Sequence, residues 1–259
     1  MFRCLNVWAY RHLIFHKAWA DFRAESRRNY LGVFWWVIDP IFNTLIYYLV
    51  FGLFLQRGGG DYVPYLITGI VGWQWFFAAV NSSSVSIWVS APLVRRVALK
   101  KIIFPLSKII MSTYKFGFAL LVLWVALLSY GYHPDSFWFL ALAPMVVQLL
   151  LITACGLILA AIIPFVPDVA SSVPYILRLG FFFSCVMYRL EKMPEQAQVY
   201  LRLNPMVHIL NSYRSVFMYG RHPDWPLLAG LAALGLGGSI LGAALIYRFD
   251  GAYAKRIVR

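Results

Sequence analysis

Long apolar stretches recur along this chain, and short polar segments separate them. A helix that crosses a lipid bilayer needs about 20 mostly apolar residues. Six windows meet that requirement: residues 33–56, 62–90, 109–131, 137–163, 171–190 and 226–247. The pattern predicts an all-α polytopic membrane protein with six transmembrane helices, in which residues 1–259 form a single transmembrane domain.

Two segments outside these windows also carry a helical apolar pattern. Residues 1–20 place Phe2, Leu5, Trp8 and Leu13 at helical spacing, which indicates an amphipathic helix lying at the membrane interface. Residues 92–104 combine clustered basic residues with an apolar pattern of their own. We expect them to form a short helix at the same interface.

The connection over residues 189–225 is long for a compact membrane protein, and prolines interrupt it. Within it, residues 191–222 alternate apolar and polar positions. Two short re-entrant helices that dip back toward the membrane before the last window fit this pattern. Non-helical backbone at that depth is tolerated where it is buried in protein or lines water.

The basic residues predict an orientation. With the N-terminus in the cytoplasm, the connections on that side carry fifteen Lys and Arg residues, against six on the other side. Because basic residues are retained in the cytoplasm, we expect both termini and residues 92–104 to lie there.

Composition excludes an ordinary soluble domain. The chain is 61% hydrophobic and only 13% charged, whereas soluble domains are about one quarter charged. The net charge of +13 would usually suggest nucleic acid, but these basic residues cluster between apolar runs. A bilayer explains that clustering better, so we expect membrane and no nucleic acid as a partner.

No energy-coupling motif is present in the sequence. The phosphate-binding pattern GxxxxGK[ST] does not occur, and acidic residues within the windows are too few for a proton-coupled carrier. His12 and His16 are four residues apart but have no third metal ligand nearby. We therefore expect no cofactor in this chain, and energy that arrives from a partner.

Three ionisable residues within or beside the windows need an explanation. Asp39 precedes Pro40, and this pair suggests a helix that begins at Pro40 with Asp39 as its cap; a proton site is the alternative. Arg178 lies eight residues into the fifth window. It either faces a cavity, a partner or an anion, or extends to the interface. Lys115 lies nearer a window end, and we expect it to extend to the interface.

Aromatic residues crowd the first two windows. Helix packing and interfacial belts account for most of them. Tyr47 and Tyr48 lie deep in a window, however, where a phenol needs a polar partner. Rings along a pore could also stack on a sugar polymer and donate hydrogen bonds to it.

Several motifs, in order along nearly the whole chain, resemble the permease subunits of ABC-2 type exporters. The first is "YLGVFWWVIDPIFNTLIYYLVFG", and the next two are "YLITGIVGWQWFFAAVNSSSVSI" and "LVRRVALKKIIFPLSKII". The last is "RLNPMVHILNSYRSVF". The short six-window form is most similar to permeases that export lipid-linked polysaccharides such as O-antigen, capsule or teichoic acid, and O-antigen exporters are the preferred match.

The resemblance implies a homodimer with two copies of a separate ABC ATPase, which would hold ATP and Mg²⁺, in a bacterial inner membrane. Residues 1–20 and 92–104 would rest on the ATPases, and residues 191–222 would gate the periplasmic mouth. The ATPase-coupling residues would be Arg95, Arg96, Lys100, Lys101 and Phe104. The aromatic residues of a channel at the dimer interface would be Tyr47, Tyr48, Trp73 and Phe76.

The implied substrate is a polysaccharide on an undecaprenyl pyrophosphate carrier. Its pyrophosphate needs a basic site near the cytoplasmic entrance. The candidates are Arg23, Arg27, Arg28 and Arg178.

Three other functions compete with polysaccharide export by a subunit that is not itself an enzyme. A drug or small-lipid exporter of the same family would carry an apolar substrate and would not need a wide polar channel. A membrane enzyme acting on lipid-linked sugars would need convergent carboxylates or histidines, which the sequence does not suggest. A structural or regulatory membrane subunit would tolerate the loss of Arg178 and of the clustered basic residues around residues 92–108.

Overall fold

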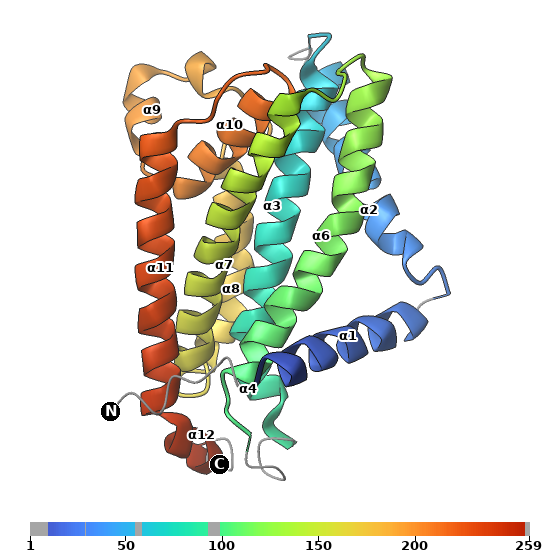
Figure 1. The fold of residues 1–259 in the computed structure, drawn as a ribbon. Helices are drawn as coiled ribbons and strands as arrows, with labels where there is room; N and C mark the ends of the chain where they lie inside the picture. Colours follow the sequence, from blue (N-terminus) through green and yellow to red (C-terminus); the bar gives the residue numbers. More distant parts are fainter. Residues whose placement is uncertain (1–9, 29, 55–58, 93–98, 257–259) are drawn as a thin grey trace.

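A computed structural model describes residues 10–28, 30–54, 59–92 and 99–256 of the chain. All regular elements in these ranges are helical, which confirms the predicted all-α architecture (Figure 1). They are α1 (Arg11–Arg28), α2 (Phe34–Tyr47), η3 (Tyr48–Phe54), α3 (Tyr62–Ser84), α4 (Ser86–Val89), α6 (Ile103–Ser129), η4 (Ser136–Ala141), α7 (Leu142–Ile162), α8 (Asp168–Phe183), η5 (Leu190–Lys192), α9 (Glu195–Arg202), α10 (Pro205–Phe217), α11 (Trp225–Arg248) and α12 (Asp250–Arg256).

Five helical runs within the described ranges are long and apolar enough to cross a membrane. They are Phe34–Phe54, Tyr62–Ser84, Ile103–Ser129, Ser136–Ile162 and Trp225–Arg248. The prediction of a sixth span at residues 171–190 is not confirmed. Its helix, α8, has 16 residues and is about 24 Å long, shorter than the hydrocarbon core of about 30 Å.

An irregular segment over residues 184–189 explains why α8 ends early. Cys185 has a φ of +53°, a left-handed conformation that stops the helix. The carbonyl groups that this segment exposes accept hydrogen bonds from the side chains of Tyr62, Tyr65 and Arg214, at 2.8–3.2 Å. Because protein donors satisfy the backbone, it can be non-helical without contact with water.

Helix α3 forms the centre of the bundle, and it packs against α2, α6, α7, α8 and α10 (Figure 1). A buried polar link fixes three of these helices to one another. The Gln148 amide donates to the Gly72 carbonyl and its oxygen accepts from Tyr213, each at 2.7 Å. Buried polar groups paired in this way specify one register between α3, α7 and α10.

Helix α11 packs closely along α7 through small residues. Gly235, Gly238 and Gly242 face α7, and a Cβ atom added at Gly242 would lie 2.7 Å from the Cβ of Leu157 and 2.9 Å from the backbone nitrogen of Ile158. Small residues of this kind let membrane helices approach closely enough for their backbones to pack.

Peripheral elements lie at the two ends of the bundle. Helices α1, α4 and α12 lie at one end, and α9 and α10 at the other (Figure 1). Of the helix predicted at residues 1–20, residues 1–9 lie outside the described ranges, and α1 continues to Arg28. Two short helices, α9 and α10, fall within residues 191–222; their relation to the membrane stays a prediction.

The segment predicted as a helix at residues 92–104 is described only in part. Residues 93–98, with Arg95 and Arg96, lie outside the described ranges. Residues 99–102 form no helix, and α6 begins at Ile103, six residues before the predicted window. The early start follows from Pro105, because proline fits the first turn of a helix and needs no hydrogen-bonding N–H there.

Candidate substrate-facing cavity

A cavity of about 350 Å³ lies between α2, α3 and α8, and we call it the α2–α8 cavity. It brings together three residues that the sequence singled out on separate helices: Tyr47, Trp73 and Arg178. The other side chains that line it are Asn43, Ile70, Gln74, Phe77, Phe181 and Phe182. The cavity therefore combines aromatic rings with two amides, a phenol and one guanidinium.

The aromatic wall of this cavity centres on Phe181, a residue that the sequence did not single out. The ring centroid of Phe181 lies 5.1 Å from that of Tyr47 and 6.1 Å from that of Trp73. The Trp73 ring in turn contacts Phe76 at 5.5 Å. At Gly180, an added Cβ atom would lie 2.9 Å from the Trp73 ring, so this glycine leaves room for the indole.

Arg178 lies on the exposed face of α8. The buried stripe of that helix is Val173, Leu177 and Phe181, whereas Ile176 and Leu179 beside Arg178 are 63% and 60% exposed. Its guanidinium lies over the ring of Tyr175 at 5.9 Å. An arginine on a face that met only lipid would be costly, so this face is better suited to a cavity or a partner.

The other predicted residues do not line the α2–α8 cavity. Tyr48 lines a separate apolar groove of about 620 Å³ between α2, α3 and α6. Arg23, Arg27 and Arg28 are exposed near the C-terminal end of α1, where Arg23 lies over the Trp19 ring at 5.2 Å. The structure thus separates Arg178 from the three arginines of α1.

The described residues of the predicted coupling segment contact the C-terminal helix. Lys101 and Lys100 form ion pairs with Asp250 of α12, at 3.5 and 3.9 Å. Phe104 is 1% exposed and packs in a small core with Tyr253. Since Phe104 is buried, it can anchor this end of the bundle but cannot itself touch a partner.

Ion pairs between α1 and α6 were missed by the sequence reasoning. Asp21 pairs with Lys108 at 2.8 Å, and Glu25 pairs with Lys115 at 2.5 Å. The expectation that Lys115 extends to the interface stays a prediction, and its amine pairs with a carboxylate of α1, the helix at that end of the bundle. The spacing in the sequence is a signal for both pairs. Asp21 and Glu25 are one helical turn apart and Lys108 and Lys115 are two turns apart, so the two acids share one helix face and the two lysines share another.

The charge on Asp21 is held by its lysine partners. Burial raises the pKa of this carboxyl, but hydrogen bonds and charges from Lys108 and Lys17 outweigh burial, and the pKa lies below its usual value. Asp21 therefore stays ionised under acidic conditions that would neutralise a free carboxyl.

The predicted capping role of Asp39 is wrong. Helix α2 begins at Phe34, and both Asp39 and Pro40 lie inside it. The Asp39 carboxylate instead accepts from the side-chain amides of Asn43 and Gln74, each at 3.2 Å. The apolar and aromatic residues before Asp39 continue the helix, so the Asp-Pro pair does not mark its start.

Comparison with known proteins agrees with the resemblance in the sequence. Residues 12–218 match the family model described as ABC-2 type transporter. The chain is 29% identical over 233 residues to the O-antigen export system permease protein RfbA of Myxococcus xanthus, which covers 88% of this chain and 89% of that protein. It is 26% identical over 201 residues to RfbA of Klebsiella pneumoniae, covering 77% and 78%.

A third relative is named for a different polymer. The chain is 26% identical over 229 residues to the polysialic acid transport protein KpsM of Escherichia coli, covering 87% of this chain and 88% of that protein. The family match spans most of the chain and includes α2, α3 and α8, which build the α2–α8 cavity. This multi-pass membrane protein belongs to the ABC-2 type transporter family.

Proposed function

We propose that this chain is the permease subunit of an ATP-driven exporter that moves a lipid-linked polysaccharide, O-antigen above all, from the cytoplasm to the periplasm. Two copies of the chain would form the channel at their interface, and two copies of a separate ABC ATPase would supply ATP and Mg²⁺. The carrier lipid would be undecaprenyl pyrophosphate, in a bacterial inner membrane with both termini cytoplasmic.

The observation that carries this proposal is the position of Arg178. It projects from an exposed apolar face of α8, beside the aromatic rings of the α2–α8 cavity. Only 11% of the apolar window in the run Phe34–Phe54, formed by α2 and η3, is buried within one copy. A second copy packed against α2 and α8 would shield Arg178 from lipid and turn two cavities into one channel.

The chemistry of the α2–α8 cavity suits a sugar polymer better than an apolar drug. Aromatic rings supply flat surfaces, and Asn43, Gln74 and Tyr47 supply donors and acceptors for hydroxyl groups. The Arg178 guanidinium suits the pyrophosphate of the carrier, because its N–H groups match phosphate oxygens. A substrate without polar groups would leave these side chains unpaired.

The end of the bundle that carries α1 and α12 would face the ATPases. Lys100 and Lys101 lie there in a turn that is fixed to α12 through Asp250. Movement imposed on this turn would pass directly into α6, whose first residue follows two positions later. We therefore keep residues 92–104 as the coupling segment, with α12 as part of the same contact surface.

The test is complementation in the source bacterium. Deletion of the chain should abolish O-antigen on surface lipopolysaccharide, and wild type should restore it. Arg178→Ala should lower export by about tenfold or more, the effect of one lost charge-assisted contact. Arg178→Lys keeps the charge and should retain part of the export.

Two outcomes would reject the proposal. O-antigen and capsule that both still reach the surface in the deletion strain would show that the chain exports neither. Full export by Arg178→Ala would remove the observation on which the substrate assignment rests. Loss of capsule with normal O-antigen would assign the chain to capsule export, as the similarity to KpsM allows.

A further inference from the structure

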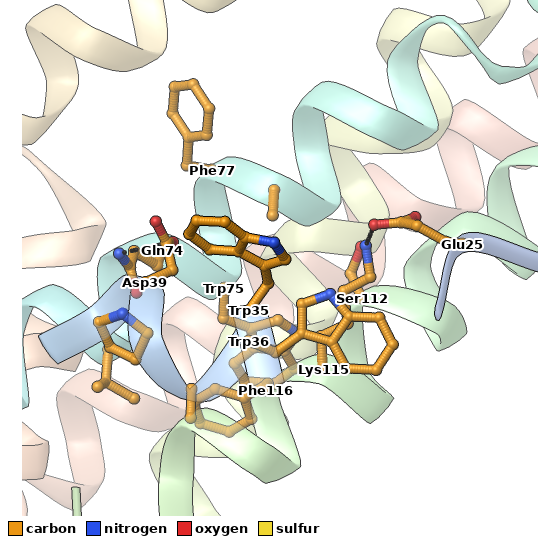
Figure 2. A pocket seen from close by; sticks show the side chains of 14 residues that line it. Glu25, Trp35, Trp36, Asp39, Gln74, Trp75, Phe77, Ser112, Lys115 and Phe116 are labelled. Carbon is orange, nitrogen blue, oxygen red and sulfur yellow. Dashed lines mark hydrogen bonds and ion pairs between the residues drawn. The ribbon is translucent and has the colours of Figure 1, made fainter. Parts of the chain in front are cut away.

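A second hollow, of about 360 Å³, lies between α1, α2, α3 and α6, and we call it the α2–α6 pocket. Figure 2 shows Asp39 and Gln74 at one end and Glu25 and Ser112 at the other, with aromatic side chains between them. Gln74 and Phe77 line both this pocket and the α2–α8 cavity, so the two hollows adjoin.

The pocket contains a buried donor without a partner. Trp75 lines the pocket and is 5% exposed, with its ring stacked on Phe116 at a centroid distance of 4.1 Å. Its Nε1–H group has no hydrogen-bond partner among the described residues. A buried N–H group without a partner is rare and costly in a protein, so this group would gain a hydrogen bond from a ligand that displaces its neighbours in the pocket.

An acceptor with spare capacity faces the same pocket. The Asp39 carboxylate takes one hydrogen bond from Asn43 and one from Gln74, and it has about four acceptor positions. Its partners among the described residues are amides, not cations. The carboxylate can therefore accept further hydrogen bonds from hydroxyl groups.

A ring surface completes the pocket. Trp35 is 44% exposed and stacks on no other ring among the described residues. The neighbouring ring of Trp36 is covered by Phe22, with centroids 4.6 Å apart, and by Lys115 at 5.4 Å. Trp35 is thus the indole that is open to a ligand.

We propose that the α2–α6 pocket binds one pyranose ring of the exported glycan, at a site separate from the channel. This inference rests on the proposed function. A pyranose has an apolar face of C–H groups that can lie on Trp35, and hydroxyl groups on its rim. Those hydroxyls would accept from Trp75 Nε1–H and donate to Asp39.

The charges of the pocket disfavour the other ligands that a membrane offers. Asp39 and Glu25 both line it, and its one lysine, Lys115, is already paired with Glu25. A phosphate group would therefore meet more negative than positive charge. A hydrocarbon chain would leave the Trp75 N–H without a partner and would offer Asp39 no further donor, and the separate apolar groove lined by Tyr48 suits it better.

The position of the pocket gives the bound sugar a role. Gln74 and Phe77 form the shared wall, so a ring in the α2–α6 pocket lies next to the α2–α8 cavity. The pocket would hold the glycan beside the channel before its rings enter. Binding there would select for glycans whose rim hydroxyls match Trp75 and Asp39.

The test measures sugar binding to the full chain with its ATPase in lipid nanodiscs by saturation-transfer NMR. The probes are methyl glycosides of glucose, mannose, galactose, N-acetylglucosamine and sialic acid, with phosphoethanolamine and glycerol phosphate as headgroup probes. Trp75→Phe keeps the ring and removes the donor, and it should weaken binding of at least one glycoside by about fivefold. Asp39→Asn should weaken binding of the same glycoside. The matched control is Trp124→Phe, on the same helix as Phe116, and it should leave glycoside binding unchanged.

Each other outcome overturns the inference. If no glycoside binds, the sugar site is refuted. It is refuted equally if every glycoside that binds does so as tightly to the Trp75→Phe and Asp39→Asn variants as to wild type. Dependence on Trp75 that is confined to phosphoethanolamine or glycerol phosphate would assign the pocket to a lipid headgroup. Surface polysaccharide in the deletion strain is measured separately, so failure of the pocket is distinguished from failure of the proposed function.

Discussion

The contact between α7 and α11 allows a matched pair of substitutions in one helix. Gly242→Ala adds a methyl group that meets the α7 backbone, at 2.9 Å from the nitrogen of Ile158. Gly237→Ala adds the same group five residues earlier, where no atom lies within 4 Å apart from the backbone of α11 itself. Both changes replace glycine by alanine in the interior of α11, so they share every effect except the contact with α7.

The expected magnitudes follow from that geometry. Alanine is favoured over glycine in a helix by about 1 kcal/mol, and this gain should be similar for both variants. Carbon atoms in ordinary contact are about 3.5–4.0 Å apart, whereas the new atom at Gly242 would be 2.7 Å from the Cβ of Leu157. Backbone must move to relieve that overlap, and overpacking costs about 1–3 kcal/mol.

The measurement is the free energy of unfolding in mixed micelles, with sodium dodecyl sulfate as the denaturant. Gly237→Ala should be neutral or more stable than wild type. Gly242→Ala should be less stable than Gly237→Ala by about 1–3 kcal/mol. Equal stabilities for the two variants would refute the inference that α7 and α11 pack through their backbones at Gly242.

Three further predictions concern other parts of the chain. Arg214→Leu removes the donor to the Val186 carbonyl and should lower the free energy of unfolding by about 1–3 kcal/mol, measured in the same micelles. Gly180→Ala should push the Trp73 ring, 2.9 Å from the new Cβ, into the α2–α8 cavity, and surface polysaccharide should fall while thermal stability holds. Asp21→Asn should destabilise by roughly 1 kcal/mol at neutral pH. The pKa of Asp21 is lowered in the folded state. The stability difference between wild type and variant should therefore be fully present above the unfolded pKa of about 4, and it should vanish as the pH falls through the folded pKa.

Each of these predictions can fail clearly. Wild-type stability for Arg214→Leu would mean that water satisfies the Val186 carbonyl. Normal export by Gly180→Ala would separate Trp73 from transport. A destabilisation by Asp21→Asn that is the same at pH 3 and pH 7 would show that the charge of Asp21 is not its source.

Five of the spans followed directly from hydropathy, because lipid acts on every residue of a spanning helix. The windows at 33–56, 62–90, 109–131, 137–163 and 226–247 each contain most of a described helix or helical run. Hydropathy did not reveal the end of α8. The run through Phe183 and Cys185 is interrupted only by Ser184, and the tyrosines whose hydroxyl groups accommodate its break lie over a hundred residues earlier.

The site was predictable in its residue types but not in its arrangement. Hydropathy placed three polar or bulky side chains within apolar windows: Tyr47, Trp73 and Arg178. Three helices bring them to one cavity. Nothing in the sequence separates Tyr48 from Tyr47, although the two line different hollows. The error at Asp39 has a similar origin, because a local signal for a helix start was overridden by the apolar residues before it.

The irregular backbone at residues 184–189 has a consequence for biogenesis. Two of its donors, Tyr62 and Tyr65, are synthesised long before the segment itself, whereas Arg214 leaves the ribosome after it. Backbone groups without partners cost several kcal/mol each in hydrocarbon. The end of α8 therefore cannot settle at its final depth until α10 has been made and docked, and a chain truncated before Arg214 should be recognised by the cell as unassembled.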